Sequence, residues 1–214
     1  MAQAQIRRWR PGELVFAGGT AAQGIFWLAR GALRLATDDG GEARLVAVVT
    51  APALAGDPAP LFGRPAALLA ATSITACHTA FWPYHRFTTM LAHRPGLALL
   101  LAQQGMQSYH QTLGRVTGLL WPCARLRILH VLVTLAQAFP APGGGGSRLP
   151  AALTQRAIGL AANTSRVSVN RVLADLRRQG IVGRTRPLHV RDTARLEALL
   201  QAEVLAAGEE AAGC

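Results

Sequence analysis

Apolar residues in the first part of the chain, residues 10–87, occur in short runs that glycine and proline turns separate. The runs are rich in aliphatic, β-branched and aromatic residues and recur at spacings of roughly 8 to 12 residues, which is typical of strands in antiparallel sheets. Six runs fit this pattern: Leu14–Phe16, Ile25–Leu28, Ala32–Ala36, Arg44–Val49, Thr72–Cys77 and Thr79–Trp82. They predict an antiparallel β-roll whose interior can hold a small ligand.

The apolar period changes to that of a helix over residues 95–121. One stripe there is spaced alternately by three and four residues: Leu99, Ala102, Met106, Tyr109, Leu113, Val116 and Leu120. This a/d pattern is typical of two helices packed along their length, so we predict a dimer seam. The alternative is a long helix that packs this stripe on its own domain. Trp121-Pro122 then interrupts the helix, because proline cannot continue the backbone hydrogen bonds. A second helix, Cys123 to Phe139, and a proline- and glycine-rich linker follow.

Two short helices joined by a tight turn are predicted between residues 153 and 180. Thr154 and Ser165 are favourable N-cap residues, and Asn163-Thr164 forms the turn. The first helix turns Ala157, Ile158 and Ala161 inward. The buried stripe of the second is Val169, Val172, Leu173 and Leu176, and Gly180 ends that helix. Residues 181–190 read as a hairpin, or wing, and a last helix begins at about Thr193. This arrangement is a winged helix-turn-helix.

The other face of the second helix carries side chains suited to duplex DNA. The major groove admits an α-helix, arginine pairs well with guanine, and asparagine pairs well with adenine. The predicted base contacts are Arg166, Val167, Asn170 and Arg171. The predicted phosphate contacts are Thr154, Gln155, Ser165 and Ser168, together with Arg184 and Arg186 of the wing.

Charge supports a polyanionic partner. The net charge is +11, and all 22 basic side chains are arginines. Nine of them lie between Arg148 and Arg191, where Asp175 is the single acid. Basic charge concentrated in one short segment indicates nucleic acid. We find no paired carboxylates, nucleophile–base pair or phosphate loop of catalytic spacing, so we predict no enzyme. The alternative from another class is an enzyme or small-molecule binder built on the barrel.

No apolar run approaches the roughly 18 to 20 residues that a membrane span needs, and no signal peptide opens the chain. We therefore expect a cytoplasmic protein without a membrane partner. The fold class is α+β, and we predict four parts. These are an effector β-roll (1–94), a dimerisation helix (95–121), a segment containing a hinge, the second helix and a linker (122–147), and the winged helix-turn-helix (148–214).

Roughly residues 8–205 resemble the Crp/Fnr family of transcription regulators. In the C-terminal part the resemblance is carried by Thr154-Gln155, Ile158, Ala161, Ser165-Arg166, Val169, Arg171-Val172-Leu173, Leu176 and Gly180-Ile181. Upstream it is carried by Pro11-Gly12-Glu13-Leu14-Val15-Phe16, Gly19, Phe26-Trp27-Leu28, Gly31-Ala32-Leu33-Arg34-Leu35 and the Gly40/Gly41-Glu42 turn. The resemblance implies a homodimer on a palindromic site, with RNA polymerase as a further partner. It also implies base contacts at Arg166 and Arg171. The family's most typical member has glutamate where this chain has Val167, which implies a different half-site.

The effector pocket departs from the members that bind cyclic AMP. Those members hold the ribose with a Gly-Glu pair, and an Arg-Ser or Arg-Thr pair holds the cyclic phosphate. This chain has Gly56-Asp57 at the first place and Leu69-Ala70 at the second, and Arg64 lies about five residues early. We therefore predict a β-roll that does not bind cyclic AMP and keep Gly56, Asp57 and Arg64 as weak pocket candidates.

Other cofactors have little support. The chain has three cysteines, Cys77, Cys123 and Cys214, far apart, whereas an iron–sulfur cluster needs about four. No metal site is predicted. Cys77-His78 is a candidate source of haem ligands, although neighbouring strand residues point to opposite faces. Cys123 is a candidate redox switch. The effector is left unassigned. An effector-free architectural DNA-binding dimer, with no sequence preference and a steep salt dependence, is the main alternative function.

Overall fold

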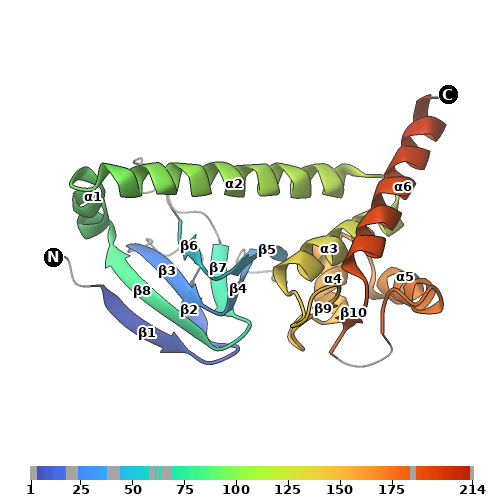
Figure 1. Ribbon diagram of the computed structural model, residues 1–214, viewed down its shortest axis with the longest axis horizontal. Helices are drawn as coiled ribbons and strands as arrows, with labels where there is room; N and C mark the ends of the chain where they lie inside the picture. The colour runs from blue at the N-terminus through green and yellow to red at the C-terminus, as the bar shows by residue number, and fades with distance from the viewer. Residues whose placement is uncertain are drawn as a thin grey trace. The chain divides into compact units, whose positions relative to one another are not determined.

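The N-terminal half forms two four-stranded antiparallel sheets (Figure 1). They are seen in a computed structural model that describes residues 4–17, 24–37, 44–57, 61, 63, 69–183 and 187–212. In one sheet the strand order is β1 (Gln5–Trp9), β8 (Cys77–Pro83), β3 (Gly24–Arg30) and β6 (Ala53–Ala55). In the other it is β2 (Leu14–Phe16), β7 (Leu69–Ser73), β4 (Ala32–Thr37) and β5 (Leu45–Thr50).

The core of this half lies between the two sheets. Phe16 of one sheet stacks on Phe26 of the other at 5.7 Å between ring centroids, and Phe26 is 4.8 Å from Phe81. Leu28 and Leu33 are fully buried in the same cluster. Burial of a side chain of this size contributes about 1.5 to 3 kcal/mol, so these inward positions hold the sheets together. The antiparallel β-roll predicted from the apolar runs is confirmed.

Three elements of this half were missed, and one predicted strand was misplaced. β1 was missed because most of its side chains are exposed, so no alternation marks it; β6 is only three residues long. Helix α1 (Tyr84–Ala92) begins after Pro83, whose side chain cannot accept an N-cap hydrogen bond, so the sequence carries no cap signal for this helix. It packs Phe87 into the fold and contacts β3 and β8. The strand predicted over 72–77 was wrong: β7 ends at Ser73, and the Thr75 hydroxyl accepts a hydrogen bond from the Ala32 N–H in the turn.

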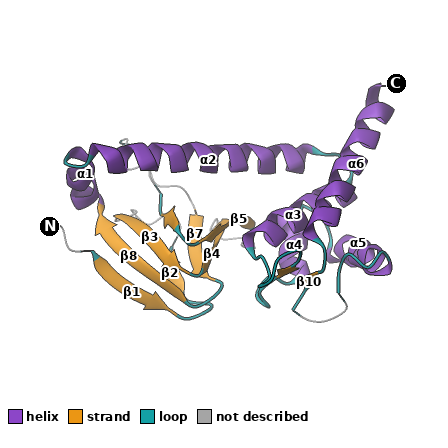
Figure 2. Cartoon of the chain, viewed as in Figure 1, coloured by secondary structure: helices purple, strands orange, loops and turns teal. Residues whose placement is uncertain are grey.

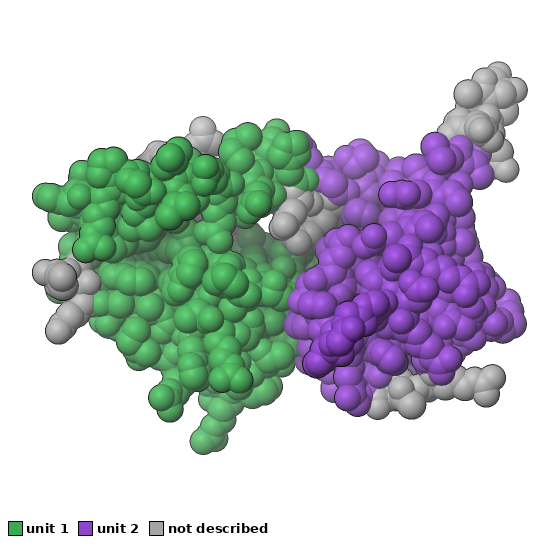
Figure 3. All heavy atoms as spheres, in the orientation of Figure 1, with its two compact units in different colours: residues 1–111 green, residues 112–214 purple. Residues whose placement is uncertain are grey.

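A 26-residue helix, α2 (Pro95–Leu120), follows α1, so the long helix predicted over 95–121 is confirmed to within a residue. The chain divides into two compact units at residues 111 and 112, inside this helix (Figure 3). The four boundaries proposed from the sequence stay a prediction.

The C-terminal unit is built around α3 (Ala124–Ala138), as the mainly helical half of Figure 2 shows. α3 contacts α4 (Gln155–Ala161), α5 (Arg166–Arg178) and α6 (Thr193–Ala212). A helix that is covered on several sides needs apolar residues around its circumference. Seven α3 residues are buried: Leu126, Ile128, Leu129, Leu132, Val133, Leu135 and Ala136.

The wing region pairs differently from the simple hairpin that was predicted. β10 (His189–Val190) pairs with β9 (Ser147–Arg148), which precedes α4 in the chain. Val190 also bridges Val182, and the Gly183 N–H donates to the His189 carbonyl at 2.7 Å. The 181–190 segment does fold back on itself, but its second strand also closes against β9. The sequence pattern could not indicate β9, because a two-residue strand carries no period.

Candidate nucleic-acid interface

The two caps of the helix-turn-helix are confirmed. The Thr154 hydroxyl accepts a hydrogen bond from the Ala157 N–H at 3.2 Å, and the Ser165 hydroxyl accepts one from the Ser168 N–H at 3.1 Å. Each cap supplies an acceptor to a helix start whose N–H groups have no partner in the helix, so the sequence fixes where α4 and α5 begin.

The turn between α4 and α5 depends on two small or turn-forming residues. Asn163 adopts φ +46°, the left-handed region that asparagine tolerates. A β-carbon on Gly159 would lie 3.0 Å from the Thr164 carbonyl, so the turn packs directly on α4. The inner face predicted for α4 is partly wrong: Ile158 is buried, whereas Ala157 and Ala161 are half-buried, and Ala162 is buried in their place.

One face of α5 is buried. All four residues of its predicted stripe, Val169, Val172, Leu173 and Leu176, are buried. The helix ends at Arg178, and Gly180, two residues later, adopts φ +73°. The Gly180 N–H donates to the Arg177 carbonyl at 3.1 Å, and the Ile181 N–H donates to the Leu176 carbonyl at 3.0 Å. These two bonds are the Schellman pattern that terminates helices. α5 is therefore fixed in rotation and at both ends.

The opposite face of α5 presents the predicted base contacts. Arg166 and Arg171 are exposed and Val167 is 59% exposed, while Asn170 is half-buried. Ser165 and Ser168 lie at the start of the helix, with their hydroxyls 3.1 Å apart. An exposed helix face that begins with arginine can enter a major groove and reach base edges.

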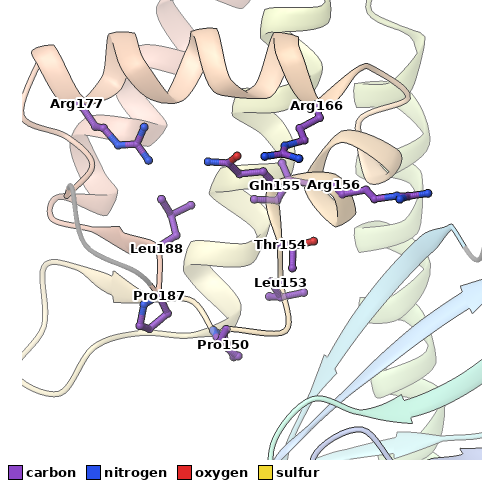
Figure 4. A pocket seen from close by; sticks show the side chains of 11 residues that line it. Pro150, Leu153, Thr154, Gln155, Arg156, Arg166, Arg177, Pro187 and Leu188 are labelled. Atoms are coloured by element: carbon purple, nitrogen blue, oxygen red, sulfur yellow. The ribbon is translucent and has the colours of Figure 1, made fainter.

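A hollow lies beside this face, between α5 and the chain around β10 (Figure 4). Figure 4 shows Gln155 and Arg166 close together, whereas Arg156 points away from them. Arg177 lines the other end of the hollow, and its Nε donates to the Gly183 carbonyl at 3.4 Å. The full lining is Pro150, Ala151, Leu153, Thr154, Gln155, Arg156, Ile158, Arg166, Arg177, Pro187 and Leu188.

Arg177 was not among the predicted contacts. Its place on the exposed side of α5 follows from the sequence, because residues eleven apart lie on nearly the same side of a helix and Arg166 is eleven residues earlier. Arg184 and Arg186 of the wing lie outside the described residues.

The single acid of this basic segment is occupied by an internal ion pair. An oxygen of Asp175 lies 2.7 Å from Nη1 of Arg125, and the Arg125 Nε lies 2.8 Å from Glu203. The hydrogen bond from Arg125 is the main reason that the pKa of Asp175 lies below its ordinary value. Asp175 also lies 3.2 Å from Nη2 of Arg178 on its own helix, so its carboxylate is paired with Arg125 and Arg178 rather than with Arg166 or Arg171.

The candidate effector residues are only partly described. Gly56 adopts φ +126°, and the Asp57 carbonyl accepts a hydrogen bond from the Tyr84 hydroxyl at 2.5 Å. Burial, followed by the nearby Asp57 charge, raises the pKa of Tyr84. Arg64 lies outside the described residues. Leu69 and Ala70 are residues of β7, paired with Thr37 and Ala36 of β4.

Cys77 and His78 occupy opposite faces of β8. Cys77 is fully buried, and its thiol donates to the carbonyls of Ala32 at 3.3 Å and Thr75 at 3.2 Å. His78 lines a surface hollow with Arg30. The two side chains do not converge, so they do not fit a shared haem site. Cys123 is exposed at the start of α3, and Cys214 lies outside the described residues. Within the described ranges, no group of three or more His, Cys, Asp or Glu side chains could hold a metal ion.

The predicted seam forms an exposed apolar stripe along α2. Ala102 is exposed, and the exposed fractions of the other six seam residues lie between 43% and 77%. Among the parts of the chain that the structure describes, no helix is both long and apolar enough to cross a bilayer.

Two family models match the chain. A cyclic nucleotide-binding domain matches residues 6–94, and a Crp-like helix-turn-helix domain matches residues 126–199. The global nitrogen regulator of Synechococcus elongatus is 27% identical over 180 residues, which cover 83% of this chain and 81% of that protein.

Solved structures show the same fold. FixK2 from Bradyrhizobium japonicum matches with a TM-score of 0.75 at 20% identity, covering 92% of this chain and 96% of that one. A CRP/FNR-family transcriptional regulator from Thermus thermophilus matches with a TM-score of 0.72 at 19% identity, covering 92% and 98% of the two chains.

Proposed function

Since the chain belongs to the Crp/Fnr family of DNA-binding transcription regulators, which are not enzymes, we propose that it acts as a homodimer on a palindromic duplex site. The observation that carries the proposal is the division of α5 into two faces. Four apolar residues bury one face, while Arg166, Val167 and Arg171 project from the other. Both ends of the helix are capped, so these side chains meet a groove as a preorganised set.

Each side chain has a role that its chemistry supports. Arg166 and Arg171 can donate two hydrogen bonds each to O6 and N7 of guanine, and Val167 can pack against a thymine methyl. Asn170, half-buried, is suited to adenine. The proposed phosphate contacts come from three places. Thr154, Gln155 and Arg177 line the hollow beside α5. Ser165 and Ser168 lie at the start of α5, and Arg184 and Arg186 belong to the wing.

The homodimer rests on the stripe of α2. Its residues follow an a/d spacing, and all seven are exposed in the single chain. An apolar stripe of this length is costly in water, and a second copy of the same helix covers it with knobs-into-holes packing. A two-fold dimer would then place two copies of α5 about 34 Å apart in successive major grooves, which demands a palindrome.

We further propose that the β-roll does not bind cyclic AMP. Leu69 and Ala70 occupy the positions at which cyclic-AMP-binding relatives offer arginine and a hydroxyl. A buried phosphate without a guanidinium partner would cost several kcal/mol. The bound dimer would act on transcription in the cytoplasm by recruiting or blocking RNA polymerase.

In vitro selection from random duplex DNA at about 150 mM salt tests the proposal, because non-specific binding is suppressed there. We expect an enriched palindrome whose half-site centres lie about 10 base pairs apart. Added cyclic AMP should leave its affinity unchanged. If the protein binds DNA without enriching any sequence, it is an architectural dimer. If cyclic AMP tightens binding tenfold or more, the assignment of the β-roll is wrong.

A further inference from the structure

Arg127 of α3 donates hydrogen bonds to four backbone carbonyls in two separate segments of the C-terminal unit. Its Nη1 reaches the carbonyls of Trp121 at 2.6 Å and Pro122 at 3.0 Å. Its Nε reaches the carbonyl of Ala162 at 3.0 Å, and its Nη2 reaches that of Asn163 at 3.3 Å. One side chain thus joins the segment after α2 to the turn of the helix-turn-helix.

The four acceptors are backbone carbonyls one or two residues beyond the C-terminal ends of two helices. Trp121 and Pro122 follow the end of α2, and Ala162 and Asn163 follow the end of α4. The last carbonyls of a helix have no N–H partner within the helix and carry its partial negative charge. A guanidinium satisfies both helix ends at once, because its donors form a rigid planar fork with a permanent positive charge. Lysine cannot reproduce this geometry.

A second contact braces the same corner between α2 and α3. His130 lies one turn after Arg127 on α3, and its ring meets that of Trp121 edge to face at 5.4 Å between centroids. A β-carbon on Gly118 of α2 would lie 2.5 Å from the His130 ring, so the two helices approach closely there. The α2–α3 corner, residues 118–130, is therefore packed on the His130 side and hydrogen-bonded on the Arg127 side.

We propose that Arg127 is a positioning residue that sets the angle between the dimer helix and the helix-turn-helix, and through it the half-site spacing that the dimer accepts. This inference rests on the proposed function, since spacing has meaning only for a dimer on a palindrome. Arg127 itself is not proposed to contact base or phosphate. Its effect passes through the carbonyls on either side of the corner.

Arg125, two residues earlier on α3, provides a matched control. It also joins separate helices, but it pairs with the carboxylates of Asp175 on α5 and Glu203 on α6 and is not bonded to the corner. Its loss should lower the stability of the unit without freeing the angle between α2 and the turn. A merely structural role of Arg127 would make the two substitutions behave alike.

The experiment uses the full-length dimer and the palindrome selected by the wild-type protein. Affinities are measured for that palindrome, for versions with spacers longer or shorter by about 2 base pairs, and for a single half-site. We compare wild type, Arg127→Gln, Arg127→Lys and Arg125→Gln, and record urea denaturation and sedimentation for each.

For Arg127→Gln we expect the preference for the native spacing to fall at least about fivefold, with half-site affinity within about twofold of wild type and the dimer intact. Arg125→Gln should keep the spacing preference despite a lower unfolding free energy. An unchanged spacing preference in Arg127→Gln overturns the inference. If that variant does not fold, the same comparison of affinities for the native and the altered spacings is made with Arg127→Lys. A wild-type protein without any spacing preference overturns the proposed function as well, whereas a wild-type preference that the variants share overturns only this inference.

Discussion

Gly118 of α2 lies directly against the imidazole of His130 on α3. A β-carbon built on Gly118 would come within 2.5 Å of His130 Cδ2 and 2.9 Å of Cγ, well inside van der Waals contact. Because Cγ is attached close to the backbone, the ring cannot yield simply by turning its tip. Glycine is therefore required here for packing, although it is otherwise unfavourable inside a helix.

Gly118→Ala should consequently destabilise the protein by about 1 to 3 kcal/mol, the usual cost of overpacking. Gly114→Ala is the control: it makes the same change in the same helix, and nothing lies within 4 Å of the added β-carbon. That substitution should stabilise by up to about 1 kcal/mol through helix propensity. Urea denaturation of both variants checks the prediction, and equal effects would refute the close approach.

Arg166→Ala and Arg171→Ala should each weaken binding to the selected palindrome by about 1 to 3 kcal/mol per half-site, because each would remove a proposed bidentate base contact. Binding to unrelated duplex DNA should change far less. Fluorescence anisotropy with both duplexes measures the difference. Arg195→Ala, an exposed change on α6, is the control. An equal loss on both duplexes would assign the two arginines to phosphates instead.

Val167→Glu should change which base pair is preferred at one position of each half-site. A valine side chain can contact only the thymine methyl, whereas a carboxylate accepts a hydrogen bond from cytosine N4. Repeating the in vitro selection with this variant should therefore enrich cytosine at a position where the wild type does not. Identical enriched sites from the two proteins would mean that Val167 does not face a base.

Met106→Glu combined with Leu113→Glu should convert the dimer to a monomer. At each of the two substituted positions, the glutamate of one helix would face the glutamate of the partner helix across the seam. Sedimentation velocity measures the mass, and circular dichroism checks that the helices remain. Gln107→Glu, an exposed residue off the stripe, is the matched control and should stay dimeric. A double variant that remains dimeric would show that the stripe is not the seam.

Asp175→Asn should lower the unfolding free energy by about 1 kcal/mol at pH 7, since it removes an ion pair that is partly open to solvent. The folded-state pKa of Asp175 lies below its ordinary value, chiefly through Arg125. The stabilisation is therefore complete above the unfolded-state pKa of about 4 and is lost as the pH falls through the folded-state value. Urea denaturation over a pH series should show wild type and variant converging below about pH 4. A difference that is constant with pH would contradict this account.

Much of the C-terminal unit could be predicted because its signals are local. An N-cap hydroxyl such as that of Ser165 acts within one helical turn, and a stripe such as Val169 to Leu176 depends only on the period of the helix. Gly180 ends α5 through bonds to the preceding turn. These interactions connect residues a few positions apart, so the sequence alone determined the bounds of α5 and which of its faces is buried.

The tertiary structure decided the rest, because the remaining contacts join residues that are far apart in the sequence. The sequence did not predict β1, because its residues are mostly exposed and show no apolar alternation. The strand forms by pairing with β8, about seventy residues away. Nothing in the sequence distinguishes Arg127 from the other helix arginines. Its role appears only in the folded chain, where its side chain bonds carbonyls that follow α2 and α4. In the sequence Asp175 is a single acid among arginines. In the folded chain Arg125 of α3 pairs with Asp175 and also with Glu203 of α6. The sequence determined which face of α5 is buried and which is exposed, through short-range periodicity and capping. The contacts of Arg125 and Arg127 with α5 and the turn before it join residues that only the folded chain brings together.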